Sequence, residues 1–222
     1  MVIQVKHVLG DQELHRVREV LASAKFQDGR LSAGLSARQV KNNEEVCSEQ
    51  TVSELNRVVM GNLVRHPEYK IAALPHRIAV PFYVRYGKGM AYGEHMDDPV
   101  MGEENRYRSD IAVTVFLNSP DEYEGGELVI STPFGRQPIK CPAGDAVLYP
   151  ASTRHQVNPV TSGERLVAVT WVQSLVRSYE QRDLLYQLGK TREKMLRKAP
   201  DSEDSRRIDN VYLNLMRMWS AV

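Results

Sequence analysis

Three residues of this 222-residue chain have the types and the spacing of a metal site. His95 and Asp97 are two positions apart, and His155 follows sixty positions after the first histidine. Side chains at i and i+2 of a strand project from the same face, so a strand through His95 and Asp97 would direct both toward one ion while Met96 turns away. Two imidazoles and one carboxylate are the protein ligands of non-haem Fe(II) oxygenases. The pattern predicts an oxidative metal site completed by His155 from another strand.

A fourth residue, Arg165, begins a run to Val172 whose side chains would alternate between the two faces of a strand. In a strand this alternation places Arg165 on one face with Val167, Val169 and Trp171. An arginine on such an apolar face is expected to be buried, and its planar guanidinium then needs an anionic partner, which it binds in a bidentate manner. A dicarboxylic cosubstrate bound at the metal would supply that anion.

These residues occur in an order that resembles a known family. Over roughly residues 76 to 175, the chain is similar to the prolyl/lysyl hydroxylase-type domain of the Fe(II)/2-oxoglutarate dioxygenases. The similar positions are Tyr86, Tyr92, His95-Met96-Asp97, Gly125-Gly126-Glu127-Leu128, Gly144-Asp145, His155, Arg165 and Trp171. Over nearly the whole chain, it resembles the bacterial PKHD-type hydroxylases, a subfamily associated with iron uptake, through Asp28-Gly29-Arg30, Ala33-Gly34 and Lys41-Asn42-Asn43.

The resemblance implies a role for each matching residue. His95, Asp97 and His155 would bind Fe(II), Arg165 would bind the distal carboxylate of 2-oxoglutarate, and Tyr86 would lie beside this cosubstrate. The enzyme would couple oxidative decarboxylation of 2-oxoglutarate to hydroxylation of a C–H bond, using O2 and, as in relatives, L-ascorbate as a reductant. The primary substrate stays open among peptidyl proline or lysine, free amino acids, small metabolites and iron-uptake molecules.

Two other classes of function are compatible with the same residues. A metal-dependent hydrolase or isomerase could use the triad without O2, and it would give Arg165 no special role. A non-catalytic iron-responsive binding protein would bind iron, would form no succinate, and could use its C-terminal helices as a partner surface. The dioxygenase hypothesis is preferred because it alone accounts for Arg165 together with the triad.

Composition restricts the class of protein further. A hydrophobic content of 42% with 26% charged residues is ordinary for a soluble globular chain. No stretch approaches the roughly 20 apolar residues of a membrane span, and the N-terminus lacks a long apolar core, so we expect a cytoplasmic protein without membrane contact. Cys47 and Cys141 do not form a disulfide framework and are expected to be free thiols. A net charge of +1 gives no general reason to bind nucleic acid.

One charge asymmetry lies close to the expected metal site. Between Glu94 and Glu127 there are ten acidic residues but only two basic ones, Arg106 and Arg108. A negative cavity mouth would attract metal cations and favour a cationic substrate. We prefer the interpretation that these acidic residues are solvated loop residues without a functional contribution.

The sequence pattern around these residues predicts an α+β fold with three regions. Residues 1–75 would be a helical support region, with helices over Asp11–Ala24, where Asp11 is the N-cap, and over Val52–Val64, both bracing the outside of a sheet. Residues 76–175 would form a double-stranded β-helix, or jelly roll, with a hairpin turn at Gly125-Gly126. Its strands are expected at 78–86, 111–117, 127–131, 136–140, 146–149 and 165–172.

Residues 176–222 are predicted to form a small helical C-terminal subdomain. Their apolar residues recur at helical spacing in two stretches, separated by residues 199–202. Asp201 or Ser202 would cap the second helix. The apolar face of this subdomain could cover the barrel wall, the site, or a second subunit, so a homo-oligomer stays open.

Overall fold

The long strand β17 (Arg165–Ser174) organises the fold, because each of its faces is buried in a different core. The face with Val167 and Trp171 packs toward a second sheet, whereas Ala168 and Val172 pack toward helices. This arrangement explains why the run is apolar on both faces, apart from Arg165 and Thr170, and buried over most of its length. The predicted face shared by Arg165, Val167, Val169 and Trp171 is confirmed.

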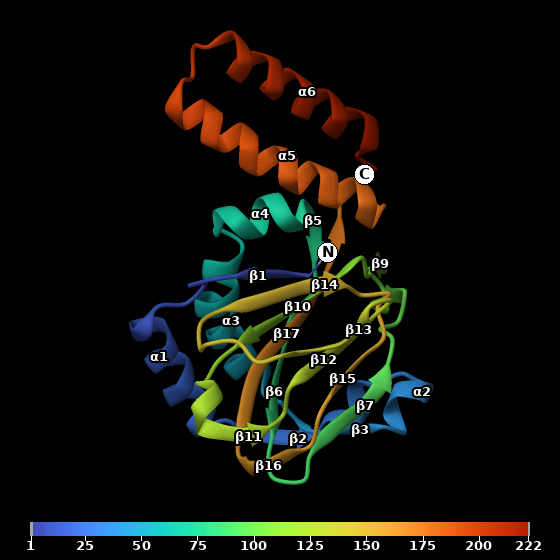
Figure 1. The fold of residues 1–222 in the computed structure, drawn as a ribbon. Helices are drawn as coiled ribbons and strands as arrows, with labels where there is room; N and C mark the ends of the chain where they lie inside the picture. The colour runs from blue at the N-terminus through green and yellow to red at the C-terminus, as the bar shows by residue number, and fades with distance from the viewer. Residues whose placement is uncertain (1, 222) are drawn as a thin grey trace.

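The computed structural model, which describes residues 2–221, contains two antiparallel sheets packed as a jelly roll (Figure 1). The larger sheet has the order β1 (Ile3–Val5), β14 (Ala146–Pro150), β10 (Ile111–Phe116), β17, β6 (Phe82–Tyr86), β4 (Glu44–Val46) and β2 (Phe26–Asp28), and β5 (Pro75–Ile78) also pairs with β17. The smaller sheet has the order β13 (Gly135–Ile139), β12 (Leu128–Thr132), β15 (His155–Val157), β7 (Ala91–His95) and β3 (Lys41–Asn42). Two short ladders add β11 (Tyr123–Gly125) with β16 (Val160–Gly163), and β8 (Val100–Met101) with β9 (Tyr107–Arg108).

Helices cover the outer face of the larger sheet, as predicted. They are α1 (Asp11–Ala22), α3 (Glu49–Leu63) and α4 (Pro67–Ala73), and their buried residues join the core formed by that face. Helix α1 is not capped by Asp11: its N-cap is Gly10, whose backbone N–H donates to the Glu13 carboxylate at 3.1 Å. Ser48 caps α3 through its side chain. The remaining short helices are η1 (Gly29–Ser32), α2 (Leu35–Arg38) and η2 (Pro120–Glu122).

Three local predictions differ from the structure. The predicted strand 78–86 is two strands, because Pro81 lacks an N–H and restricts the residue before it. The first 75 residues contribute strands β1 to β4 in addition to helices, and these strands extend both sheets. Gly125-Gly126 is not a hairpin turn, since β11 before it pairs with β16 and β12 after it pairs with β13 and β15.

The C-terminal region forms the predicted pair of helices, α5 (Tyr179–Lys198) and α6 (Glu203–Trp219), which project beyond the sheets beside α4 (Figure 1). Ser202 caps α6 by accepting a hydrogen bond from the Ser205 N–H at 3.1 Å. The base of the pair is closed where the Ala221 N–H donates to the Leu175 carbonyl at 2.7 Å. No helix within residues 2–221 combines the length and the apolar character that crossing a membrane requires.

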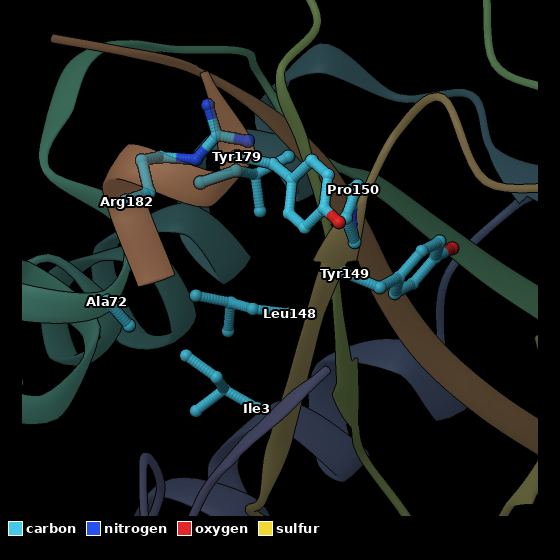
Figure 2. Close-up of a pocket in the computed structure, with 8 residues that line it drawn as sticks. Ile3, Ala72, Leu148, Tyr149, Pro150, Tyr179 and Arg182 are labelled. Atoms are coloured by element: carbon cyan, nitrogen blue, oxygen red, sulfur yellow. The ribbon is translucent and has the colours of Figure 1, made fainter. Parts of the chain in front are cut away.

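Helix α5 joins the rest of the protein at its first turns and along α4. Arg182 is buried and donates to the carbonyls of Val176 and Arg177 at 2.8 Å. It borders a cavity of about 20 Å³ (Figure 2), in which Leu148 is directed toward Ile3 whereas the next residue, Tyr149, points to the opposite side of β14. Alternate side chains of β14 therefore enter the helical core and the space between the sheets.

Candidate active site

Three side chains converge between the two sheets. His95 and His155 occupy directly opposite positions on the neighbouring strands β7 and β15. The Nε2 atoms of His95 and His155 lie 3.9 Å and 3.7 Å from Asp97 Oδ1, and one ligand atom from each residue falls within 4.8 Å of the others. All three side chains are less than a tenth exposed. The structure therefore brings together the three residues that the sequence predicts to share one ion.

Backbone carbonyls fix the tautomer of both imidazoles. His95 Nδ1 lies 2.8 Å from the Gly93 carbonyl, and His155 Nδ1 lies 2.9 Å from the Thr153 carbonyl. A carbonyl oxygen can only accept, so each Nδ1 carries a proton, and in the neutral form of each ring the lone pair then lies on Nε2, which faces Asp97. Metal-binding histidines are commonly oriented in this way by a hydrogen bond from the other ring nitrogen.

Burial and aromatic packing define the electrostatics of the triad. Burial, reinforced by the neighbouring His155, lowers the pKa of His95 to about 4, so this imidazole is neutral at pH 7. Tyr92 stacks on the His95 ring with centroids 3.7 Å apart, and Tyr149 meets the His155 ring edge-on at 5.0 Å. Burial raises the pKa of Asp97, whose Oδ2 has no hydrogen-bond partner. Two imidazole nitrogens and an unsatisfied buried carboxylate oxygen fit a divalent cation.

Asp97 reaches this position from outside the strand. Strand β7 ends at His95, and the chain leaves the sheet before Pro99, which has no N–H for a ladder hydrogen bond. The predicted strand was expected to include Asp97, but it ends two residues earlier, at His95. Met96 is half exposed and borders the cavity that holds the triad.

Arg165 is buried in the same cavity as the triad, with 1% of its surface exposed. Its guanidinium carbon lies 5.0 Å from the ring centroid of Tyr86 and 5.7 Å from that of Phe116. Within residues 2–221 it forms no ion pair, and its Nε has no hydrogen-bond partner. A buried cation without a counter-charge is costly, so this position favours an anionic ligand.

The cavity that joins Arg165 to the triad has a volume of about 690 Å³. Tyr86, opposite Arg165 in the β6–β17 register, lines its inner part. Its outer part is bordered by the exposed apolar side chains of Leu31, Val80, Met96 and Val100. Within the described chain no residue of α5 or α6 lines the cavity, so the helical pair is not a lid in this structure.

The acidic segment contributes little charge to this cavity. Glu94 pairs with Arg136 and Arg154 at the surface, and Arg108 pairs with Asp110. Asp98 and Glu103 are the acidic residues of the segment, besides Asp97, that line the cavity. Most of the charge asymmetry is thus solvated or paired, in agreement with the preferred interpretation.

One wall of the cavity was not predicted as part of the site. Lys41, Asn43 and Glu45 alternate along the segment that leads from β3 to β4, and all three are buried and line the cavity. Lys41 Nζ donates to Ser32 Oγ at 2.8 Å and to Glu45 Oε1 at 2.5 Å. These three residues occupy every second position, as on one face of a strand, and this spacing was visible in the sequence. Polar residues spaced in this way ordinarily indicate a solvated strand edge.

Gly125 allows the end of β11 to pass close to Pro159, just before β16, which gives a testable packing prediction. Its φ is +69°, and an added Cβ would lie 2.1 Å from the Pro159 carbonyl oxygen. Gly125→Ala should lower the free energy of unfolding by ~3 kcal/mol, from roughly 1–2 kcal/mol of backbone strain and roughly 1–3 kcal/mol of overpacking. Urea denaturation measures this loss. The control is Gly89→Ala, where φ is +82° but the space is open, and an equal loss in both variants would contradict the packing argument.

Comparison with known proteins identifies the class to which this fold and site belong. Residues 81–173 match the model of the 2OG-Fe(II) oxygenase superfamily, and residues 180–221 match the PKHD-type hydroxylase C-terminal domain. A PKHD-type hydroxylase of Thioalkalivibrio sulfidiphilus is 50% identical over the whole of both chains. Another, from Acaryochloris marina, is 41% identical over 99% of this chain and all of its own.

The fold agrees with that class. A prolyl hydroxylase from Trichoplax adhaerens, solved in complex with a hypoxia inducible factor peptide fragment, superimposes with a TM-score of 0.54 at 15% identity, covering 83% of this chain and 86% of its own. The protein is an Fe(II)/2-oxoglutarate-dependent oxygenase by fold and family. Within that superfamily, the chain belongs to the PKHD-type hydroxylases.

Proposed function

We propose that His95, Asp97 and His155 bind Fe(II) and that Arg165 binds the distal carboxylate of 2-oxoglutarate, with Tyr86 beside it. The observation that carries the proposal is the buried Arg165, which lies in the cavity that holds the triad and forms no ion pair with any residue of the described chain. A bidentate carboxylate would satisfy this guanidinium. A hydrolase or isomerase using the same triad would leave Arg165 without a function, and so we do not favour it.

The protein contributes binding, orientation and a dry environment. When bound, iron and 2-oxoglutarate supply oxidative decarboxylation to succinate and CO2, together with the transfer of one oxygen atom of O2 into a substrate C–H bond. The Nε2 atoms of the two histidines and the Asp97 carboxylate would hold the metal. Tyr92 and Tyr149 pack against the imidazoles and restrict their motion.

The primary substrate would enter through the outer part of the cavity. The apolar border formed by Leu31, Val80, Met96 and Val100 favours a substrate with an apolar surface. The resemblance to iron-uptake-associated hydroxylases supports a substrate, or a genetic setting, connected with iron acquisition. A non-catalytic iron-binding protein is the alternative, and it differs in forming no succinate.

The setting of the enzyme follows from the same chemistry. We propose L-ascorbate as the reductant, since the metal must stay ferrous between turnovers. A cytoplasmic location is supported by the free thiols Cys47 and Cys141, of which Cys47 is exposed, because exposed thiols persist in reducing compartments. Exposed Leu184, Val211, Leu213 and Met218 on the C-terminal helices are candidates for contact with a second copy of the chain.

Anaerobic absorbance spectroscopy tests the proposal. We expect a weak visible charge-transfer band when the purified apoprotein receives both Fe(II) and 2-oxoglutarate, and no band with either one alone. Admission of O2 should then consume 2-oxoglutarate and release succinate. Stoichiometric iron binding without a band would contradict the dioxygenase assignment and favour an iron-binding or hydrolytic function.

A further inference from the structure

The unassigned wall of the cavity links the two sheets. Strand β3 pairs with β7 of the smaller sheet, and β4 pairs with β6 of the larger one. Asn43 lies between these two strands and is 4% exposed. This segment lies outside residues 81–173, which match the oxygenase model. Its contacts are therefore a contribution of the N-terminal region to the site.

Asn43 is held in place from one side by Gly29. The Gly29 N–H donates to the Asn43 carbonyl at 2.9 Å, and a Cβ at Gly29 would lie 1.9 Å from Asn43 Oδ1. No side chain larger than hydrogen fits there while the amide keeps its position. Gly29 and Asn43 belong to the short motifs Asp28-Gly29-Arg30 and Lys41-Asn42-Asn43, which the fold thus places in contact.

On its other side, Asn43 determines what the Tyr86 hydroxyl can do. Asn43 Nδ2 donates to the Tyr86 hydroxyl oxygen at 2.9 Å. An amide nitrogen has no lone pair to accept with, so the phenolic proton cannot be donated back to it. Burial raises the pKa of Tyr86, which therefore keeps that proton. The hydroxyl is left as a donor inside the cavity that it shares with Arg165.

We propose that Asn43 is a positioning residue for cosubstrate binding: it holds the Tyr86 hydroxyl so that its proton is donated to the carboxylate bound by Arg165. Tyr86 and Arg165 are direct cross-strand partners, so their side chains leave the sheet on the same face. The inference rests on the proposed binding of 2-oxoglutarate at Arg165. It also gives Gly29 a physical role, which is to leave space for the Asn43 amide.

Asn43→Asp reverses the direction of this hydrogen bond and is the informative variant. A carboxylate can only accept, so it would take the Tyr86 proton away from the cosubstrate. We expect Asn43→Asp to raise the Kd of 2-oxoglutarate about tenfold or more, since hydrogen bonds to charged groups are worth about one tenfold step or more. Asn43→Ala leaves Tyr86 free to donate and should raise the Kd only about two- to threefold. Asn43→Asp, although closer to asparagine in shape than Asn43→Ala, is thus expected to raise the Kd more.

The experiment is isothermal titration of Mn(II)-loaded protein with 2-oxoglutarate under argon. Each Asn43 variant is measured in the wild-type and Tyr86→Phe backgrounds, because repulsion by the new charge acts in both whereas the proton effect needs the hydroxyl. We expect the effect of Asn43→Asp to shrink to about two- to threefold in Tyr86→Phe. Asn42→Asp, the same charge change at the neighbouring exposed position, is the matched control and should be close to wild type.

Different outcomes would contradict the positioning role of Asn43 and the proposed binding of 2-oxoglutarate. Gly29→Ala, which displaces the Asn43 amide, should behave like Asn43→Ala, and thermal melting together with Mn(II) binding shows that each variant is folded. Equal Kd values for Asn43→Asp and wild type, or an effect of Asn43→Asp that is undiminished in Tyr86→Phe, would overturn the positioning role. Absence of 2-oxoglutarate binding by the wild-type protein would instead overturn the proposed function.

Discussion

His155→Ala should abolish ferrous iron binding and, with it, oxygen-dependent turnover. His155 supplies one of three ligand atoms that fall within 4.8 Å of one another, and its ring is fixed by the Thr153 carbonyl. Changes to groups that merely orient a metal ligand cost roughly 10–100-fold in affinity or activity, so removal of a ligand should cost at least about 100-fold. Equilibrium dialysis against Fe(II) under argon measures the affinity, and succinate release measures the turnover.

A histidine elsewhere provides the matched control for this variant. His15 lies on α1 with 78% of its side chain exposed. His15→Ala should therefore bind iron and turn over like the wild type. If His155→Ala retained wild-type iron affinity in a folded protein, the triad would not be the metal site.

Arg165→Ala should leave iron binding intact but weaken 2-oxoglutarate binding by about 100-fold. The guanidinium is 1% exposed and forms no ion pair among residues 2–221. Truncating one partner of a buried, hydrogen-bonded charge pair costs about 2–5 kcal/mol, and about 2.7 kcal/mol corresponds to this 100-fold change. The measurement is the 2-oxoglutarate concentration that gives half of the visible band.

A shorter 2-oxo acid makes the test specific. Pyruvate has the keto acid group of 2-oxoglutarate but lacks the distal carboxylate, so the wild-type protein should strongly prefer 2-oxoglutarate whereas Arg165→Ala should lose most of this preference. Arg85→Ala is the control, because Arg85 pairs with Glu44 and does not line the cavity. An unchanged preference in Arg165→Ala would place the anion site elsewhere.

The parts of the fold with strong periodicity were predictable from the sequence. Strand β17 is a nearly continuous apolar run because its two faces enter different cores, and α3 has apolar residues at helical spacing because only one stripe is buried. The convergence of the triad and the burial of Arg165 in the same cavity were predictable because this combination of residue types and spacings is uncommon. The periodic patterns are local in sequence, and the site is indicated by an uncommon combination of a few side chains.

The elements that were predicted only in part, or not at all, carry no such signal. Strand β7 is short and mixed, with the sequence Ala-Tyr-Gly-Glu-His, and it gains its conformation from pairing with β15 and β3. The segment through Asn43 is polar and would be solvated if it were alone. Its burial depends on contacts with Gly29 and Tyr86, which are distant in sequence, and short-range patterns do not report such contacts.

Strand β17 makes the oxygenase site and the helical layer share a single wall. Val169 and Trp171 line the cavity, while the alternate residues Ala168 and Val172 pack in the core that includes α3 and α4. One layer of backbone therefore separates the triad from the helical side. Substitutions on helices that do not line the cavity can shift the register or tilt of that layer, so the tolerance of this enzyme to surface engineering will be lower on its helical side than on its smaller sheet.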